Sequence, residues 1–152
     1  MESWASSPAV RNVMRSNRGR DTRPEMALRR ALHAAGLRYR LNARPIPDSR
    51  MTVDVVFPRA RVAVEVRGCF WHACPKHYRP SRRNADFWSA KIAGNVARDD
   101  AKRIALSAAG WTLVVVWEHD EVPEAVERVK AAIADSGRLK STELQSTRLV
   151  TH

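Results

Sequence analysis

The sequence predicts an α/β fold in which a mixed β-sheet lies between helices, and three observations support this fold. Three segments carry apolar residues at helical spacing between capping residues, namely 22–36, 86–110 and 123–137. Two short runs rich in β-branched residues, 51–57 and 61–66, are typical of strands. The continuous apolar run 111–117 is typical of a strand covered on both faces. A chain of 152 residues fits one domain and can bury about two thirds of its surface.

The N-terminal part divides into an arm and a helix. Residues 1–21 are polar and basic, so we expect a basic N-terminal arm outside the core. The helix begins at Thr22 as N-cap, with Glu25 three residues later as the reciprocal partner of a capping box. Pro24 suits the first helical turn, and Gly36 suits the end of the helix.

The next three segments are expected to be strands. Apolar and basic or polar residues alternate along 37–42, which predicts a half-buried strand with a basic outer face. The apolar positions of that strand are Leu37, Tyr39 and Leu41. Only the tripeptide Pro-Arg-Ala separates the runs 51–57 and 61–66, so these two are expected to form a hairpin.

A long helix is predicted next, with Asp86 as its cap and Gly110 as its C-terminal stop. Its apolar positions are Phe87, Ile92, Val96 and Ile104. The apolar run 111–117 then predicts a central strand.

The C-terminal part contains one more helix. Pro123 suits the start of this helix, and Gly137 suits its end. Segment 138–152 is polar and aperiodic, so we expect it to be a disordered tail. The predicted order is one helix, three strands, a helix, a strand and a helix, and the sequence contains no internal repeat.

The charge balance favours a polyanionic partner. Lys and Arg number 27 against 16 Asp and Glu, which gives a net charge of +11 and a pI near 10.9. Nucleic acid is the first candidate and an acidic membrane surface the second. The sequence has no apolar run of membrane-spanning length and no signal-peptide pattern, so we expect a cytoplasmic protein.

Two predicted strands each carry one acid in an otherwise apolar run. These acids are Asp54 and Glu65, and Arg67 shares a strand face with Glu65. A buried carboxylate costs several kcal/mol unless it is paired or binds a cation. A divalent cation beside a phosphodiester, with Arg67 as an adjacent positive charge, would explain the pattern. An exposed strand face or a salt bridge to an arginine is the alternative.

Both cysteines lie in the stretch GCFWHACPKH, residues 68–77. Cys69, Cys74 and His77 supply three of the four ligands of a tetrahedral zinc site. The best candidate for the fourth is His119, directly after the predicted strand 111–117. The alternative is a pair of buried free cysteines with solvent-facing histidines.

The same stretch holds His72, which this ligand set does not need. A histidine held beside an acid pair is well placed for general acid or base work. The flanking Phe70 and Trp71 suit base stacking, although such rings are more often core residues. On the long helix, one face carries Asn95, Asp99 and Arg103. This face is either a solvated stripe or the source of an aspartate that orients His72.

Three blocks of sequence resemble the very short patch repair endonucleases, enzymes that nick DNA 5′ to the T of a T:G mispair. The blocks are GCFWH, FWSAKIAGNVARD and GWTLVVVWE, and the N-terminal VMRSNRGRDTRPE extends the resemblance. It runs from about residue 10 to residue 119. The resemblance implies a restriction-endonuclease-like core with a structural zinc ion and Mg²⁺ as the catalytic metal ion.

The resemblance also implies roles for individual residues. Asp54 corresponds to the Mg²⁺-binding aspartate, His72 to the catalytic histidine and Asp99 to the aspartate partner of that histidine. Glu25 corresponds to a glutamate near the metal-bound waters. Residues implied to contact the DNA, as wedges in either groove or as neighbours of such wedges, are Met14, Arg15, Phe70, Trp71, Trp88 and Asn95.

The chain departs from the best-known family pattern at three places. Val66 and Arg67 stand where that pattern has threonine and histidine, but the Val66 carbonyl can still bind Mg²⁺ and Arg67 can stabilise phosphate charge. Glu65 replaces an apolar residue, which makes a two-carboxylate Mg²⁺ site plausible. His119 replaces a cysteine of the zinc site.

The expected function is therefore Mg²⁺-dependent nicking of T:G-mispaired double-stranded DNA in very short patch repair. We expect a monomer at the bacterial nucleoid, with other mismatch-repair proteins as candidate partners. One alternative is a related nuclease that cuts other DNA targets. Another is a catalytically silent zinc-stabilised DNA-binding module.

Overall fold

The computed structural model describes the backbone of residues 21–149 and the side chains of residues 21–137. The elements in order are α2 (Arg23–Ala34), β1 (Arg40–Ala43), β2 (Val53–Phe57), β3 (Val62–Arg67), α3 (Ala85–Ala108), β4 (Thr112–Trp117) and α4 (Val122–Leu149). This order confirms the predicted succession of helices and strands, and the fold is mixed α/β. The expected N-terminal arm, with Met14 and Arg15, lies outside the described residues.

The four strands form one mixed sheet in the order β1-β2-β3-β4. The predicted hairpin is confirmed, because β2 pairs antiparallel with β3, and β1 pairs antiparallel with β2. α3 connects β3 to β4, and these two strands are parallel. The prediction that 111–117 is a central strand is wrong, since β4 is an edge strand. Its apolar run reflects helices on both faces, and Arg128 of α4 donates a hydrogen bond to the Val115 carbonyl at the open edge.

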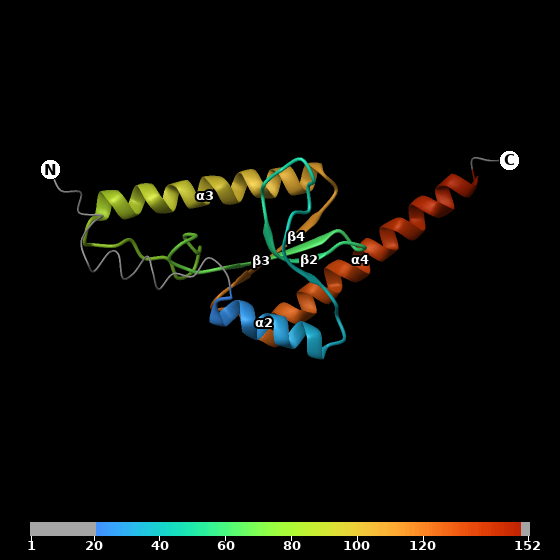
Figure 1. Ribbon diagram of the computed structural model, residues 1–152, viewed down its shortest axis with the longest axis horizontal. Coiled ribbons are helices and arrows are strands. Elements are labelled where there is room, and N and C mark those ends of the chain that lie inside the picture. Colours follow the sequence, from blue (N-terminus) through green and yellow to red (C-terminus); the bar gives the residue numbers. More distant parts are fainter. Residues whose placement is uncertain (1–20, 150–152) are drawn as a thin grey trace.

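Helices cover both faces of the sheet (Figure 1). On one face α2 and α4 pack together and enclose the larger core cluster, in which Leu28 and Leu32 meet Val55 and Val64. On the other face α3 inserts Leu106 against a smaller cluster. Its strand residues are Val53, Val56 and Ala63. Asp54 and Glu65 alternate with residues of the larger cluster, so both acids lie on the α3 side of the sheet.

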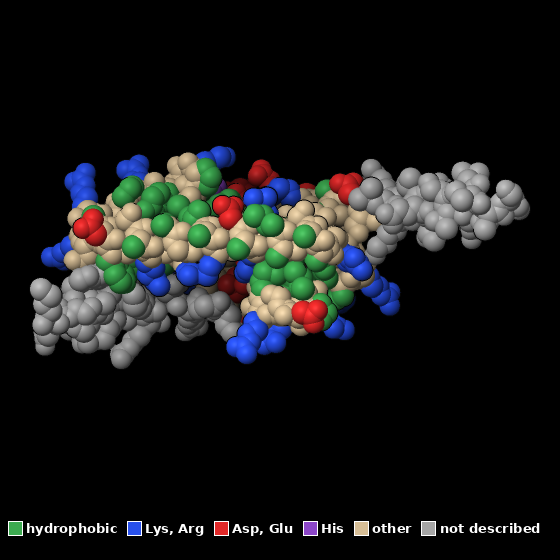
Figure 2. Space-filling view, turned by 90° about the horizontal axis from the view of Figure 1, so that it is seen from above, with side chains coloured by type: hydrophobic (Ala, Val, Ile, Leu, Met, Phe, Trp, Pro, Cys, Tyr) green, Lys and Arg blue, Asp and Glu red, His purple; other side chains and the backbone are tan. Residues whose placement is uncertain are grey.

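Three residues predicted to be buried are exposed instead. Leu41 is 40% exposed, because Asn42 adopts a positive φ of 44° and the chain before β1 buries Leu37 and Tyr39 against the core. Val96 and Ile104 are 37% and 58% exposed, since α3 covers the narrow α3-side cluster with Leu106 alone. Figure 2 looks down on this side of the molecule and shows hydrophobic side chains exposed among Lys and Arg.

The helix ends also differ from the predictions. Thr22 caps α2 as expected, but Glu25 accepts a hydrogen bond from the backbone N–H of Asp21 and not of Thr22. The N-cap of α3 is Asn84, and Asp86 lies in the first turn, where its negative charge interacts favourably with the helix dipole. α4 does not end at Gly137 but continues to Leu149, because an interior glycine costs a helix only about 1 kcal/mol.

In the described part of the chain, no helix is both long enough and apolar enough to cross a lipid bilayer.

Candidate active site and metal centre

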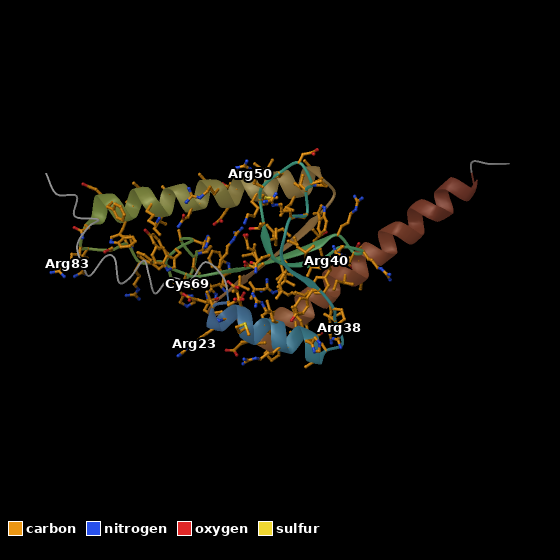
Figure 3. All side chains as sticks on the ribbon, viewed as in Figure 1. Arg23, Arg38, Arg40, Arg50, Cys69 and Arg83 are labelled. Carbon is orange, nitrogen blue, oxygen red and sulfur yellow. The ribbon has the colours of Figure 1, made fainter. Side chains whose placement is uncertain are left out.

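The candidate site is a hollow of about 440 Å³ where the sheet meets α2, α3 and the loop after β3. In Figure 3 the labelled Cys69 lies between α2 and α3, and the labelled Arg38 and Arg40 lie to the right of it, toward the other end of α2. The lining residues that carry chemistry are Glu25, Asn42, Asp54, Glu65, Trp71, His72, Lys91, Asn95, Lys102 and Glu118. The hollow therefore brings together residues that lie far apart in the sequence, from the start of α2 to the end of β4.

Three carboxylates approach one another in this hollow. Asp54 accepts a hydrogen bond of 2.8 Å at Oδ2 from the backbone N–H of Val66. Burial raises the pKa of Asp54 to about 6, and the nearby negative charges of Glu25 and Glu65 add to this rise. The Val66 N–H and the Lys102 ammonium act in the opposite direction. A group of carboxylates in which burial and mutual repulsion raise the pKa of Asp54 suits a hard divalent cation with oxygen ligands.

Glu65 is 6% exposed and lies between two cations. The guanidinium of Arg67 donates to Oε2 of Glu65 at 3.1 and 3.3 Å, so these two residues share a strand face as predicted. The ammonium of Lys102, from α3, contacts Oε1 of Glu65. The alternative of a salt bridge to arginine is therefore present in the structure, and a lysine that the sequence analysis missed accompanies it.

His72 and Asp99 form the predicted pair across the hollow. Nδ1 of His72 lies 2.7 Å from Oδ2 of Asp99, and Asp99 is held between this imidazole and Arg67 Nε at 3.9 Å. Because an ionised carboxylate can only accept a hydrogen bond, Nδ1 carries the proton and Nε2 is the acceptor nitrogen. The pair therefore fixes both the tautomer and the orientation of His72.

The shared face of α3 is confirmed for two of its three residues. Asn95 donates a hydrogen bond of 2.8 Å to the Trp71 carbonyl and so ties the loop to the helix beside Asp99. Arg103 instead turns to solvent, where its exposed guanidinium lies 3.7 Å from Asp100. The expected stripe therefore ends after Asp99, and beyond it Lys102, not Arg103, is the α3 residue that lines the hollow.

Lys102 and Glu118 line the candidate site, and the sequence analysis missed both. Lys102 follows Asp99 by three positions, a helical spacing that could have placed it on the same face. Glu118 accepts a hydrogen bond of 2.9 Å from the backbone N–H of Cys69 and also lines the hollow. It thereby links the cysteine loop to the acidic site. Its only sequence signal was its place beside His119.

The predicted zinc ligands come together. One ligand atom from each of Cys69, Cys74, His77 and His119 lies within 4.8 Å of the others. His119 Nδ1 lies 3.1 Å from Cys69 Sγ and 3.6 Å from Cys74 Sγ. Ligand atoms around tetrahedral Zn²⁺ are separated by about 3.3 to 3.8 Å, given Zn–S and Zn–N bond lengths of about 2.3 and 2.0 Å. The set therefore fits a metal ion of this kind.

The charge state of Cys69 also responds to this environment. Burial raises the pKa of the Cys69 thiol to about 12, and the adjacent Cys74 and Glu118 add to this rise. Such a thiol stays protonated without a cation, whereas a bound metal ion removes the proton. The proximity of the four side chains, and not this pKa, is what makes them a candidate metal centre.

The predicted wedge residues pack against one another. Trp88 is 8% exposed and packs against both Phe70 and Trp71, with ring-centroid distances of 5.5 and 5.6 Å. Phe70 and Trp71 are half-buried and meet edge to face at 5.3 Å. These rings therefore form a small cluster of their own, and Trp71, one of its two partly exposed members, lines the hollow that contains His72.

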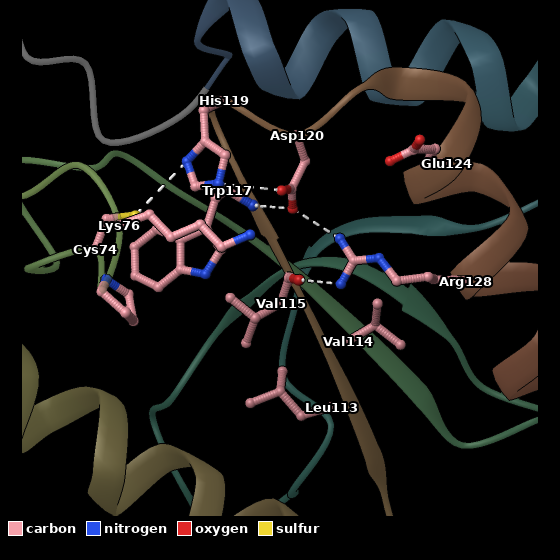
Figure 4. Close-up of a pocket in the computed structure, with 11 residues that line it drawn as sticks. Cys74, Lys76, Leu113, Val114, Val115, Trp117, His119, Asp120, Glu124 and Arg128 are labelled. Carbon is pink, nitrogen blue, oxygen red and sulfur yellow. Dashed lines mark hydrogen bonds and ion pairs between the residues drawn. The ribbon is translucent and has the colours of Figure 1, made fainter.

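A second hollow, of about 600 Å³, lies on the other side of His119 along the edge of β4. Figure 4 shows the ion pair between Arg128 and Asp120 and the hydrogen bond that Arg128 donates to the Val115 carbonyl. The ion-pair distance is 2.7 Å. These polar groups satisfy one another across the edge strand. The acid cluster and the ordered histidine lie in the hollow of about 440 Å³, which is therefore the better candidate for an active site.

Comparison with known proteins agrees with this geometry. Residues 6–78 match the family described as DNA mismatch endonuclease Vsr. The type II nicking enzyme V.NaeI of Lentzea aerocolonigenes is 42% identical over 125 residues, which cover 81% of this chain and 73% of that protein. V.XorIIP of Xanthomonas oryzae pv. oryzae, also a type II nicking enzyme, is 44% identical over 71% of this chain and 78% of its own length. DNA mismatch endonuclease Vsr of Escherichia coli K12 is 35% identical over 69% of this chain and 66% of its own length.

Proposed function

This chain belongs to the Vsr family of DNA mismatch endonucleases, and on that premise we propose that it nicks T:G-mispaired double-stranded DNA. The proposed reaction is Mg²⁺-dependent hydrolysis of the phosphodiester 5′ to the mispaired T. One observation carries this proposal. The ordered His72–Asp99 pair opens onto the same hollow as the Asp54 carboxylate, so a proton-transfer group and a cation site can meet at one phosphodiester.

The proposed metal ligands are Asp54, Glu65 and the Val66 carbonyl. These oxygen donors suit Mg²⁺, which when bound would lower the pKa of a coordinated water and offset the negative charge that develops on the phosphate. Glu25 reaches the same hollow from the first turn of α2, where it is 5% exposed and paired with Arg29 at 3.2 Å. It is therefore fixed in place to accept a hydrogen bond from water near the metal.

His72 is the proposed proton-transfer residue. Its Nε2 is the nitrogen available to the substrate, because Nδ1 is committed to Asp99. Asp99 keeps the imidazole in this tautomer and stabilises it when a proton is held at Nε2. Arg67 supplies a fixed positive charge beside the pair and can stabilise the phosphate.

The proposal for the rest of the chain follows the same family. A restriction-endonuclease-like core would occupy 22–137 and hold one structural Zn²⁺ through its Cys and His ligands. Residues proposed to contact the mismatched duplex are Met14, Arg15, Phe70, Trp71, Trp88 and Asn95. The aromatic cluster supports this, because Trp71 lines the hollow and both Phe70 and Trp71 are partly exposed.

A second candidate is nicking at a DNA sequence without a mispair. The names of V.NaeI and V.XorIIP favour it, because both are described as type II nicking enzymes and neither name mentions a mismatch. Both candidates use the same chemistry and differ only in the DNA that is recognised.

One experiment separates the candidates. Purified zinc-loaded protein and Mg²⁺ are incubated with duplexes that are identical except for a T:G or a T:A pair, each in a set of flanking sequences. The proposal expects a nick 5′ to T in the T:G duplex only. Equal nicking of both duplexes would support the second candidate, and no nicking of any duplex would contradict both.

A further inference from the structure

Lys102 enters the candidate active site from α3. Its ammonium contacts Glu65 Oε1 and donates a hydrogen bond of 3.1 Å to the backbone carbonyl of Thr52. The lysine side chain is 23% exposed and the Glu65 side chain 8% exposed, so the contact is largely shielded from solvent. A shielded contact between opposite charges is much stronger than the same contact on an open surface.

Both carboxylate oxygens of Glu65 are occupied by cations. Arg67 holds Oε2 through two nitrogens and also faces Asp99, so it is anchored on two sides. Lys102 holds Oε1 through a single ammonium on a flexible stem. A divalent cation that uses Glu65 therefore has to displace one of these partners, and the singly held lysine is the easier one to displace.

We propose that Lys102 is a positioning residue that holds Glu65 in place and competes with the divalent cation for Oε1 of that carboxylate. This inference rests on the metal site proposed above. Displacement leaves the ammonium bonded to the carbonyl of Thr52, which lines the same hollow. Lys102 thus lowers the affinity of the empty site for the metal ion and keeps the acid cluster neutralised until that ion binds.

The chain offers a matched control at Lys91. This lysine also lines the hollow and also comes from α3, about three turns before Lys102. A general effect of positive charge in the hollow would appear on removal of either lysine. An effect transmitted through Glu65 would appear only on removal of Lys102.

The experiment measures Mn²⁺ binding by the zinc-loaded full chain without DNA, from the electron paramagnetic resonance signal of free Mn²⁺. Lys102→Met is compared with Lys102→Arg, Lys91→Met and the unmodified protein. We expect Lys102→Met to lower the Kd for Mn²⁺ by roughly fivefold or more, because one competing charge is gone. Lys102→Arg and Lys91→Met are expected to stay within about twofold of the unmodified protein.

A double substitution tests the route through Glu65. In a Glu65→Gln background, Lys102→Met is expected to change the Kd for Mn²⁺ by less than about twofold, since the shared carboxylate is missing. A gain of affinity that persists without Glu65 overturns the inference. An unchanged or higher Kd in Lys102→Met overturns it as well, and Lys102→Gln gives the same test if the methionine variant does not fold.

The measurement is independent of nicking. Competition at Glu65 is read from Mn²⁺ binding alone, whereas the proposed function is read from cleavage of duplex DNA by the unmodified protein. A protein that fails to nick can therefore still show the expected change in Kd, and a protein that nicks can still fail to show it.

Discussion

At the scale of single residues, the behaviour of the site depends on the charge of Asp54. Burial raises its pKa to about 6, and Glu25 and Glu65 add to this rise. A carboxylate whose pKa is higher in the folded than in the unfolded chain destabilises the fold when it is ionised. Ionisation of Asp54 therefore lowers the stability of the folded protein at neutral pH, and a bound cation would offset this cost.

Asp54→Asn is accordingly expected to stabilise the protein in the absence of added divalent cations. At pH 7.5 the free energy of unfolding should rise by on the order of 2 kcal/mol, because the ionised carboxylate is removed. As pH falls, Asp54 in the unmodified protein takes up its proton near pH 6, so the advantage should shrink between pH 6 and the ordinary aspartate pKa of 3.8. Urea unfolding at several pH values checks this, and a destabilised variant at pH 7.5 would contradict the assignment.

Asp99→Asn tests the ordering of His72. The amide can donate to Nδ1 and so favour the wrong tautomer, which would leave Nε2 protonated. We expect kcat for nicking to fall by about 100-fold or more, with little change in duplex affinity. Asp100→Asn is the control, because Asp100 is the next residue on α3 and is exposed. Equal losses in both variants would mean that Asp99 acts through general charge and not through His72.

At the scale of secondary-structure elements, the loop after β3 carries much of the site. It supplies three of the four candidate zinc ligands, and its His72 faces the acid cluster. Glu118, at the end of β4, binds the backbone of Cys69 and ties the loop to the sheet. Release of the metal ion should therefore disturb His72 although His72 is not a ligand.

Cys74→Ser checks this coupling. The unmodified protein is expected to hold about one equivalent of zinc, and the variant less than about half of that at the same free zinc concentration. The free energy of unfolding should fall by more than about 2 kcal/mol, and nicking should be lost. Elemental analysis measures the zinc content, urea unfolding measures the free energy of unfolding, and a nicking assay measures the activity. A variant that keeps full zinc content would show that the four side chains are not the ligands.

Leu106 and Ile104 report how α3 is oriented on the sheet. Leu106 is fully buried and Ile104 is 58% exposed, although the sequence analysis expected Ile104 to be buried. Leu106→Ala should lower the free energy of unfolding by about 2 to 4 kcal/mol, and Ile104→Ala by less than about 0.5 kcal/mol. Urea unfolding of the two variants checks the orientation, and a reversed order would mean that α3 is rotated about its axis.

These elements also show what the sequence could predict. Capping residues, β-branched runs and the hairpin turn are local signals, and they located all described helices and strands to within a few residues, apart from the end of α4. The apolar run 111–117 signals coverage by helices, which an edge strand can also have, so its place in the sheet was wrong. Val96 and Ile104 are exposed because α3 contacts the smaller core cluster through Leu106. The spacing of apolar residues along the helix does not indicate how large this contact is.

At the scale of the whole molecule, the site is assembled from segments far apart in the chain. The resemblance implied that Asp99 is the partner of His72, and the spacing of cysteines and histidines predicted the four zinc ligands; the structure brings both groups together. The resemblance did not indicate Lys102, because this chain also departs from the best-known family pattern at Glu65, the residue that Lys102 contacts. A departure at one residue of a buried charge network changes which partners that network needs.

The net charge of +11 belongs to this scale as well. The acidic hollow holds three carboxylates, but positive charges such as Arg67 and Lys102 surround them. These charges reduce the repulsion that an approaching polyanion would meet. We therefore expect that the affinity for the duplex and the rate of phosphodiester hydrolysis can be changed independently. A substitution in the acid cluster can abolish the second and preserve the first.

The most direct test is the single-turnover rate of nicking of a T:G duplex in Mg²⁺ by the unmodified protein, Asp54→Asn and His33→Ala. His33 is an exposed histidine at the end of α2, outside the hollow, and serves as the control. The account predicts that Asp54→Asn binds the duplex but nicks it at least about 100-fold more slowly, and that His33→Ala stays within about twofold of the unmodified rate. Nicking by Asp54→Asn at the unmodified rate would contradict the assignment of the active site.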